Sequence, residues 1–232
     1  MRDHQPIAVD TLLSHVALFG GLAPTKLAKL AKGTREQRYG KDNIVFQQGD
    51  ICTGLHVMVF GQVKLSVSSA QGVEKVVDVV QQGQCLDKAS IFVDKPYPVS
   101  AQTLGNCTLL HISKSVIFDE LADDHELVRR VMAGIARRTH QLMLDMESYS
   151  LLSGRQRIIN YLMSELDESR HGDENVVIEL RVRKGVIASR LNLTQEHFSR
   201  ILHELSELGL IKVDGTRIII PNVECLNKHK TE

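Results

Sequence analysis

The segment Gly185–Arg200 constrains the fold of this chain most, because it joins two short helical patterns through a tight turn. Apolar residues of the first pattern recur at about one helical turn: Val186, Ile187 and Leu191. Asn192-Leu193 suits the corner between two helices, and Thr194 is placed to cap the second helix. The segment therefore predicts a helix-turn-helix, a motif whose second helix enters the major groove of DNA.

The second helical pattern has one apolar and one polar face. We expect four apolar residues to be buried: Phe198, Ile201, Leu202 and Leu205. Four polar residues share the outward face near the start of this helix: Gln195, Glu196, Ser199 and Arg200. Early residues of a recognition helix are those that reach base edges, so these four are candidate DNA-reading residues.

Positive charge is concentrated around this motif, although the chain as a whole has no net charge. Between Leu180 and His203, Glu196 is the single acidic residue, against five basic residues: Arg181, Arg183, Lys184, Arg190 and Arg200. Such a cluster is typical of a surface that meets phosphates, and a plain solvated basic face is the alternative.

The length of 232 residues favours two domains, and a 43% hydrophobic content supplies ordinary cores. No apolar run approaches the roughly 20 residues that span a bilayer, and the N-terminus does not resemble a signal peptide. The four cysteines lie far apart, without a Cys-x-x-Cys pair. We therefore expect a cytoplasmic protein with free thiols, without a structural metal and without a membrane partner.

Short strand-like segments separated by glycine turns follow the N-terminal helices predicted between Val9 and Lys32. They are Ile44 to Gln47, Leu55 to Phe60, Gln62 to Ser68, Glu74 to Val80, Val99 to Thr103 and Thr108 to Ile112. Their turns fall at Gly49-Asp50, Gly61, Gln71-Gly72 and Gln82-Gly83. Many short strands at this spacing predict a β jelly-roll, so the fold class is α+β.

A long helix is predicted next, starting near Ser113 or Asp124 and ending near Ser150. Apolar residues recur every seven positions along it: Val128, Ile135, Leu142 and Tyr149. Val131 begins a less regular second row three residues after the first, and Asp145 falls at or beside the seam, where facing carboxylates would repel. The pattern favours the seam of a homodimer, and the alternative is a helix that lies on its own barrel.

Ser153-Gly154 interrupts the helical periodicity and marks a boundary between residues 1–152 and 153–232. After the helix-turn-helix, Asp214-Gly215 separates two β-prone runs, which predicts a tight hairpin. The C-terminal domain is therefore expected to be a winged helix-turn-helix. Its wing places Lys212 or Arg217 near a phosphate, unless these are plain exposed strand residues.

A barrel, a long helix and a winged helix-turn-helix together resemble the Crp/Fnr family of bacterial transcription regulators over nearly the entire chain. Ile44–Asp50 and Gly61–Leu65 are similar to the family's barrel turns, and Arg183–Arg200 follows its helix-turn-helix. The resemblance implies a cyclic-nucleotide-binding-like jelly-roll as sensor, a homodimer on a palindromic double-stranded DNA site, and recruitment of RNA polymerase.

Glu196, Ser199 and Arg200 resemble the recognition triplet of the Fnr-type branch, which implies a TTGAT half-site and its inverted repeat. Glutamate accepts from a cytosine amino group, and arginine donates to guanine O6 and N7. The resemblance also puts Lys184 at a phosphate contact and Gln195 at a variable position. An intrahelical Glu196–Arg200 pair is the alternative role.

The family's cyclic-nucleotide sensors hold ribose with a glutamate and phosphate with an arginine. This chain has Lys88 at the first position and Lys95-Pro96-Tyr97 at the second, which removes both contacts and argues against cyclic AMP. Lys88 and Lys95 are candidates for a different anionic effector. The absence of cysteines before Cys52 argues against an iron-sulfur cluster.

Haem remains open as a cofactor, because Asp94–Gln102 looks similar to a barrel loop of the nitric-oxide-responsive denitrification regulators. Its axial ligand would come from one of five histidines: His15, His56, His111, His125 and His140. A DNA-binding dimer without a ligand is an alternative function. A cupin-like metal enzyme is a remote one, since the chain has no His-x-His and no recognisable catalytic motif.

Overall fold

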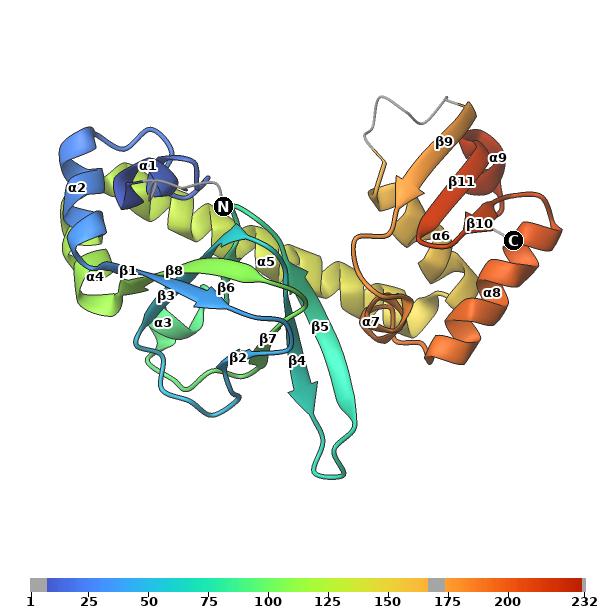
Figure 1. Ribbon diagram of the computed structural model, residues 1–232, viewed down its shortest axis with the longest axis horizontal. Helices are drawn as coiled ribbons and strands as arrows, with labels where there is room; N and C mark the ends of the chain where they lie inside the picture. Colours follow the sequence, from blue (N-terminus) through green and yellow to red (C-terminus); the bar gives the residue numbers. More distant parts are fainter. Residues whose placement is uncertain (1–7, 167–173, 231–232) are drawn as a thin grey trace, which may run out of the picture. The chain divides into compact units, whose positions relative to one another are not determined.

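The structure is a computed structural model that describes residues 8–166 and 174–230 (Figure 1). Its internal contacts divide the chain into two compact units, Met1–His140 and Gln141–Glu232. The boundary predicted from the sequence lies later, between residues 152 and 153, where one helix ends at Leu151 and the next begins at Gly154. Contacts thus group the end of the long helix with the second unit.

The first unit is an antiparallel jelly-roll preceded by two helices, α1 (Val9–Ser14) and α2 (Pro24–Lys32). One sheet has the order β1-β8-β3-β6 and the other has the order β2-β7-β4-β5. The strands are β1 (Thr34–Tyr39), β2 (Ile44–Phe46), β3 (Gly54–Phe60), β4 (Val63–Ser68), β5 (Glu74–Val80), β6 (Cys85–Leu86), β7 (Ser100–Thr103) and β8 (Cys107–Ser113). A short helix, α3 (Ser90–Val93), lies between β6 and β7.

The predicted strands are confirmed within a few residues at their ends, and β1 and β6 are additional. β1 carries charged and polar side chains, and it is held by backbone pairing to β8 from Thr34↔Ile112 to Tyr39↔Cys107. β6 contains only two residues. Neither segment has the apolar alternation from which a strand is predicted.

The long helix is divided in two at Asp124. Helix α4 spans Lys114–Asp123 and helix α5 spans His125–Leu151, so the two starting points expected from the sequence belong to different helices. Asp124 accepts from the Leu127 amide at 2.9 Å and from Lys26 Nζ at 2.6 Å, which caps α5 and ties it to α2. No helix in residues 8–166 and 174–230 is long and apolar enough to cross a membrane.

One face of α5 packs on the barrel of its own chain. Leu127, Val131 and Gly134 are buried there, and Arg138 pairs with Asp78 of β5 at 2.9 Å. These positions are spaced by three or four residues, as one helical face requires. The predicted seam position Val131 is therefore corrected: its side chain is 7% exposed and packs within its own domain.

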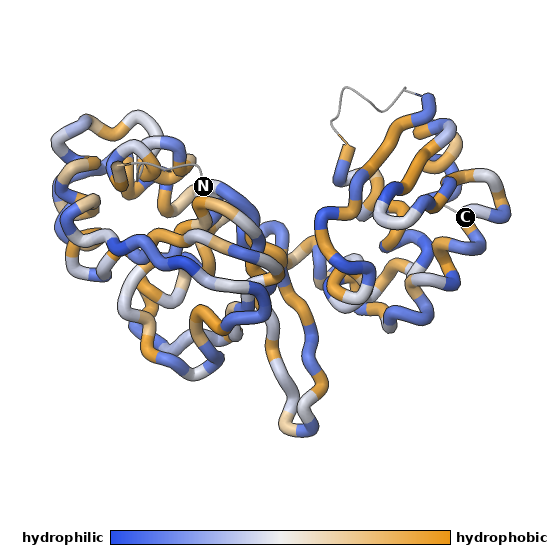
Figure 2. Tube along the Cα trace, in the orientation of Figure 1, coloured by the Kyte–Doolittle hydropathy of each residue, from blue (hydrophilic) through white to orange (hydrophobic). Residues whose placement is uncertain are grey.

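The second unit is a winged helix-turn-helix. Its elements are α6 (Gly154–Ser164), β9 (Glu174–Glu179), α7 (Lys184–Arg190), α8 (Gln195–Glu207), β10 (Lys212–Asp214), β11 (Arg217–Asn222) and α9 (Val223–Lys228). The strands form an antiparallel sheet in the order β10-β11-β9. Figure 2 shows hydrophilic and hydrophobic residues mixed along α8, and the four apolar residues predicted to be buried are in the core: Phe198, Ile201, Leu202 and Leu205.

Candidate functional site

The turn between α7 and α8 has the predicted geometry. Asn192 has a φ of 59°, a left-handed conformation that asparagine tolerates better than most residues. The Thr194 hydroxyl accepts a hydrogen bond from the His197 amide at 3.2 Å and so caps α8. The helix-turn-helix expected from the sequence is confirmed.

Two side chains bind the backbone of this turn, a role that the sequence pattern does not predict for either. Arg157 of α6 donates from Nη1 to the carbonyls of Leu191 at 2.8 Å and Asn192 at 3.1 Å. The Tyr149 hydroxyl of α5 donates to the Arg190 carbonyl at 2.6 Å. Arg190 is the last residue of α7 and Leu191 and Asn192 follow it, where carbonyls have no intrahelical donors, so both side chains stabilise the corner that positions α8.

The four candidate DNA-reading residues are exposed together in the first turns of α8: Gln195, Glu196, Ser199 and Arg200. Glu196 and Arg200 are exposed, and no ion pair joins them in the described part of the chain, so the hydrogen-bonding groups of both side chains are available to a ligand. The Gln195 amide oxygen lies 2.7 Å from where a Cβ on Gly185 would be, so this side chain leans over the start of α7.

Basic residues flank this exposed face. Lys184 is the first residue of α7 and is half-buried, whereas Arg183 before it is exposed. In the wing, Lys212 and Arg217 are exposed, and Arg217 lies opposite Asp214 in the register of the β10–β11 hairpin. A major-groove helix flanked by cations can bind base edges and the phosphates on either side.

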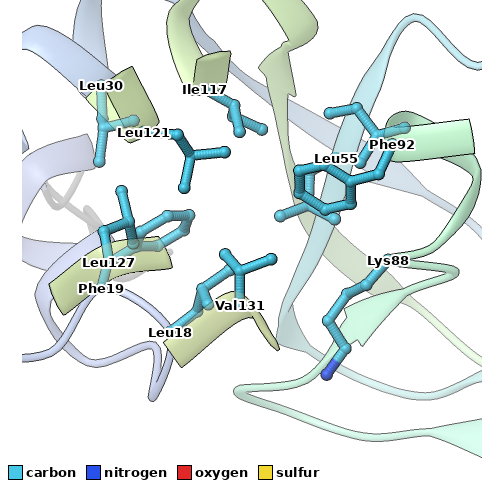
Figure 3. Close-up of a pocket in the computed structure, with 11 residues that line it drawn as sticks. Leu18, Phe19, Leu30, Leu55, Lys88, Phe92, Ile117, Leu121, Leu127 and Val131 are labelled. Atoms are coloured by element: carbon cyan, nitrogen blue, oxygen red, sulfur yellow. The ribbon is translucent and has the colours of Figure 1, made fainter. Parts of the chain in front are cut away.

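A separate cavity lies in the first unit, between the barrel and the helices (Figure 3). It is small and partly open to solvent: its cavity volume is about 10 Å³, room for about one water molecule. Its lining residues come from the α1–α2 connection, α2, β3, α3, α4, α5 and the residues before α3: Leu18, Phe19, Leu30, Leu55, Lys88, Ile91, Phe92, Ile117, Leu121, Leu127 and Val131. We call it the helix–barrel cavity.

Lys88 is the one charged residue of this lining, and Figure 3 shows its ammonium at the edge of the apolar cluster. Its Nζ lies 3.5 Å from where a Cβ on Gly134 of α5 would be, so the side chain reaches the long helix. Lys95 is exposed after α3 and does not line the cavity. The two lysines predicted as an effector site are therefore not joined in this one.

Histidine is buried elsewhere in the barrel. His56 of β3 is 6% exposed, and its Nδ1 has no hydrogen-bond partner. Burial, and secondarily the nearby charge of His111, lower the pKa of His56 to about 3. The His56 and His111 rings are 4.7 Å apart, and His111 Nε2 lies 3.1 Å from the Thr53 hydroxyl.

Neither the helix–barrel cavity nor the surroundings of His56 suit haem. The lining of the helix–barrel cavity contains no histidine, cysteine, methionine or tyrosine that would serve as an axial ligand. His56 packs beside the stacked Phe46 and Tyr97 rings, 5.5 Å from the former and 6.5 Å from the latter. Across residues 8–166 and 174–230, no group of three or more metal-binding side chains gathers at one place.

The outward side of α5 carries a row of apolar side chains that the rest of the described chain leaves uncovered. Met132 and Met146 are 64% exposed and Leu142 is 47% exposed. With the predicted row they alternate by four and three residues: Val128, Met132, Ile135, Thr139, Leu142, Met146 and Tyr149. We call these residues the α5 stripe. The second row thus lies four residues after the first, whereas Asp145, at the three-residue spacing, accepts from Gln141 Nε2 at 3.0 Å.

Both domains match known families. Residues 36–124 match the cyclic nucleotide-binding domain, and residues 156–229 match the Crp-like helix-turn-helix domain. A CRP-like cAMP-activated global transcriptional regulator of Mycobacterium tuberculosis is 22% identical over 221 residues, which cover 94% of this chain and 98% of that protein.

Solved structures agree in fold. DNR from Pseudomonas aeruginosa is 29% identical, with a TM-score of 0.51 and coverage of 97% of this chain and 99% of that chain. FixK2 from Bradyrhizobium japonicum has a TM-score of 0.73 at 17% identity, covering 84% of this chain and 96% of that chain. The matched domains and relatives are those of transcription regulators rather than enzymes.

Proposed function

Because the chain belongs to the Crp/Fnr family of transcription regulators, we propose that it is a homodimer that reads a TTGAT-type inverted repeat. The observation that carries this proposal is the exposed Glu196, Ser199 and Arg200 face at the start of α8. These side chains match the hydrogen-bonding edges of such a half-site, with Arg200 on guanine and Glu196 on the paired cytosine's amino group. This triplet also favours the Fnr-type branch of the family.

Phosphate contacts would set the register of α8 on the duplex. Lys184 at the start of α7 and Arg183 beside it are suited to this role, and the exposed wing residues Lys212 and Arg217 extend the basic surface. Thr194 supports the same function through the cap that fixes the start of α8. RNA polymerase is the partner that the family implies once the protein is bound.

The homodimer would form along the α5 stripe. Exposed apolar side chains in a three-and-four alternation are typical of a coiled-coil seam, and a second copy of the same helix is the occupant that matches them in length and spacing. The opposite face of α5 is already engaged by its own barrel through Val131 and Arg138. A two-fold dimer presents two α8 helices to the two halves of a palindrome.

The effector would differ from cyclic AMP. Lys88 stands where a ribose-binding glutamate is expected, and its side chain reaches Gly134 on α5. An ammonium cannot accept hydrogen bonds from ribose hydroxyls, and Lys95 offers a point charge in place of a bidentate guanidinium. A constitutive dimer without a ligand remains the alternative that an effector screen would separate from this proposal.

The test is DNA binding by the full chain with Arg200→Ala and a matched control, Arg217→Ala in the wing. We expect Arg200→Ala to cost about 1 to 3 kcal/mol per half-site on the TTGAT palindrome and to relax the preference for guanine. Arg217→Ala should weaken binding equally on specific and random duplexes. The same loss from Arg200→Ala on both duplexes would refute the proposed readout.

A further inference from the structure

We propose that Gly185 positions Gln195, so that Gln195 presents its amide nitrogen, and not its amide oxygen, to a base edge in the major groove. Gly185 is then a positioning residue, and Gln195 is the side chain through which it acts on sequence preference. This inference rests on the proposed function, since it requires that α8 reads DNA, and it adds which bases Gln195 accepts.

The backbone at position 185 does not require a glycine. Gly185 is the second residue of α7, and it lacks the positive φ angle that Gly209 and Gly215 have in the same unit. A glycine inside a helix lowers stability relative to alanine, because it loses more backbone freedom on folding. The consequence of this glycine therefore lies in the space that its missing side chain leaves open.

The side chain of Gln195 occupies that space. A Cβ on Gly185 would lie 2.7 Å from the Gln195 amide oxygen and 3.6 Å from its amide carbon. The first distance is too short for a contact between a carbon and an oxygen atom, so any side chain at position 185 would displace the amide. Gln195 thus depends on Gly185 for its place over the first turn of α7.

The amide of Gln195 lies with its oxygen on α7. Its nitrogen is not among the atoms within 4 Å of the same point, so the NH2 group is turned away from Gly185. The first backbone N–H groups of a helix have no intrahelical acceptor, and Arg183 supplies no side-chain cap to α7, which favours an oxygen here. Because Gln195 is exposed at the start of α8, its NH2 group is available to DNA.

A glutamine held in this way acts only as a hydrogen-bond donor. Guanine O6 and N7 and thymine O4 accept hydrogen bonds in the major groove, whereas cytosine presents an amino group there. The bidentate pairing of glutamine with adenine needs the amide oxygen as acceptor for the adenine N6 amino group. We therefore expect Gln195 to contact guanine or thymine and to lack the preference for adenine that an unconstrained glutamine has.

Selection of binding sites by the full chain from randomised duplexes tests this with two variants and their combination. Gln195→Ala should abolish the preference at one base pair of each half-site, which identifies the pair that Gln195 contacts. Gly185→Ala should free the amide and shift the preference at that pair toward adenine by about fivefold or more, the lower end of what a bidentate contact contributes. Adding Gly185→Ala to Gln195→Ala should change no preference further.

The combined variant separates positioning from a general effect on α7. A disturbed α7 would lower affinity for specific and random duplexes alike, and this loss would persist in the Gln195→Ala background. Alanine favours a helix over glycine, so the denaturant midpoint of Gly185→Ala should not fall. The proposal is wrong if Gly185→Ala leaves the base preference unchanged or lowers the midpoint, if its shift persists without Gln195, or if Gln195→Ala affects no base pair.

The selected sequence keeps the two proposals apart. Selection of the TTGAT palindrome, without a shift in Gly185→Ala, overturns only the positioning role of Gly185. Selection of a different palindrome, on which the variants behave as expected, overturns only the proposed half-site.

Discussion

The Tyr149 hydroxyl donates to the Arg190 carbonyl at 2.6 Å, so the last turn of α5 is hydrogen-bonded to the end of α7. Tyr149 also occupies the final position of the α5 stripe. One residue therefore belongs to the row that we assign to dimerisation and also contacts the helix that precedes the recognition helix.

Tyr149→Phe removes this hydrogen bond and keeps the ring. We expect it to destabilise the helix-turn-helix by about 1 kcal/mol, the usual net contribution of one hydrogen bond. The dimerisation constant should be unchanged, since the apolar ring remains. Hydrogen exchange of the α7 amides measures the first effect and sedimentation equilibrium the second. Unaltered exchange would show that the bond contributes nothing to the corner.

Arg157→Met should destabilise the same corner more strongly, by about 1.5 to 3 kcal/mol, because a charged donor to two carbonyls is lost. Arg155→Met, two residues earlier, is the matched control. Arg155 makes only a 3.5 Å pair with Glu204 between side chains that are 39% and 42% exposed, so its loss should cost at most about 1 kcal/mol. Denaturant unfolding followed by circular dichroism compares them, and equal losses would contradict the assigned role of Arg157.

The helix-turn-helix could be predicted from the sequence because its determinants are local. The apolar spacing, the Asn192 turn and the Thr194 cap lie within a few residues of one another. The two contacts that stabilise its corner could not be predicted in this way. Tyr149 and Arg157 donate to backbone carbonyls more than thirty positions away in sequence. Every residue has a backbone carbonyl, so the residue type at the acceptor position does not reveal such a contact.

In the first unit, too, contacts between residues far apart in sequence decide features that the sequence pattern does not predict. β1 is extended because β8 offers it a full set of backbone partners, whatever its side chains are. The face of α5 that meets the barrel is likewise set by packing. A three-residue step from Val128 leads to Val131, which is buried in its own chain, and a four-residue step leads to the exposed Met132. Both steps are compatible with a heptad pattern, so only the fold separates them.

The α5 stripe predicts different effects on dimerisation for substitutions at Leu142 and at its neighbour Met143. Leu142→Lys places an ammonium in the stripe of both copies and should weaken the dimer at least about a hundredfold, because each of the two copies loses about 1.5 kcal/mol or more of apolar burial. Met143→Lys is the control, since Met143 is 62% exposed but lies outside the stripe. Sedimentation equilibrium compares the two, and a dimer that survives Leu142→Lys would exclude the stripe as the seam.

Buried His56 predicts a pH dependence of stability in the acidic range. Its pKa is about 3 in the folded chain, against an ordinary value of 6.5, chiefly because burial disfavours the charged imidazolium. Between these two values the unfolded chain binds a proton that the folded chain does not, so the free energy of unfolding falls as the pH falls, by up to about 1.4 kcal/mol per pH unit.

His56→Leu removes this titration, and its free energy of unfolding, measured from pH 7 to pH 4, should decline less steeply than that of the parent. His140→Gln, at an exposed residue of α5, serves as the control and should leave the parent slope intact. Parallel profiles for the parent and His56→Leu would mean that His56 is protonated in the folded barrel, which its lack of a partner at Nδ1 argues against.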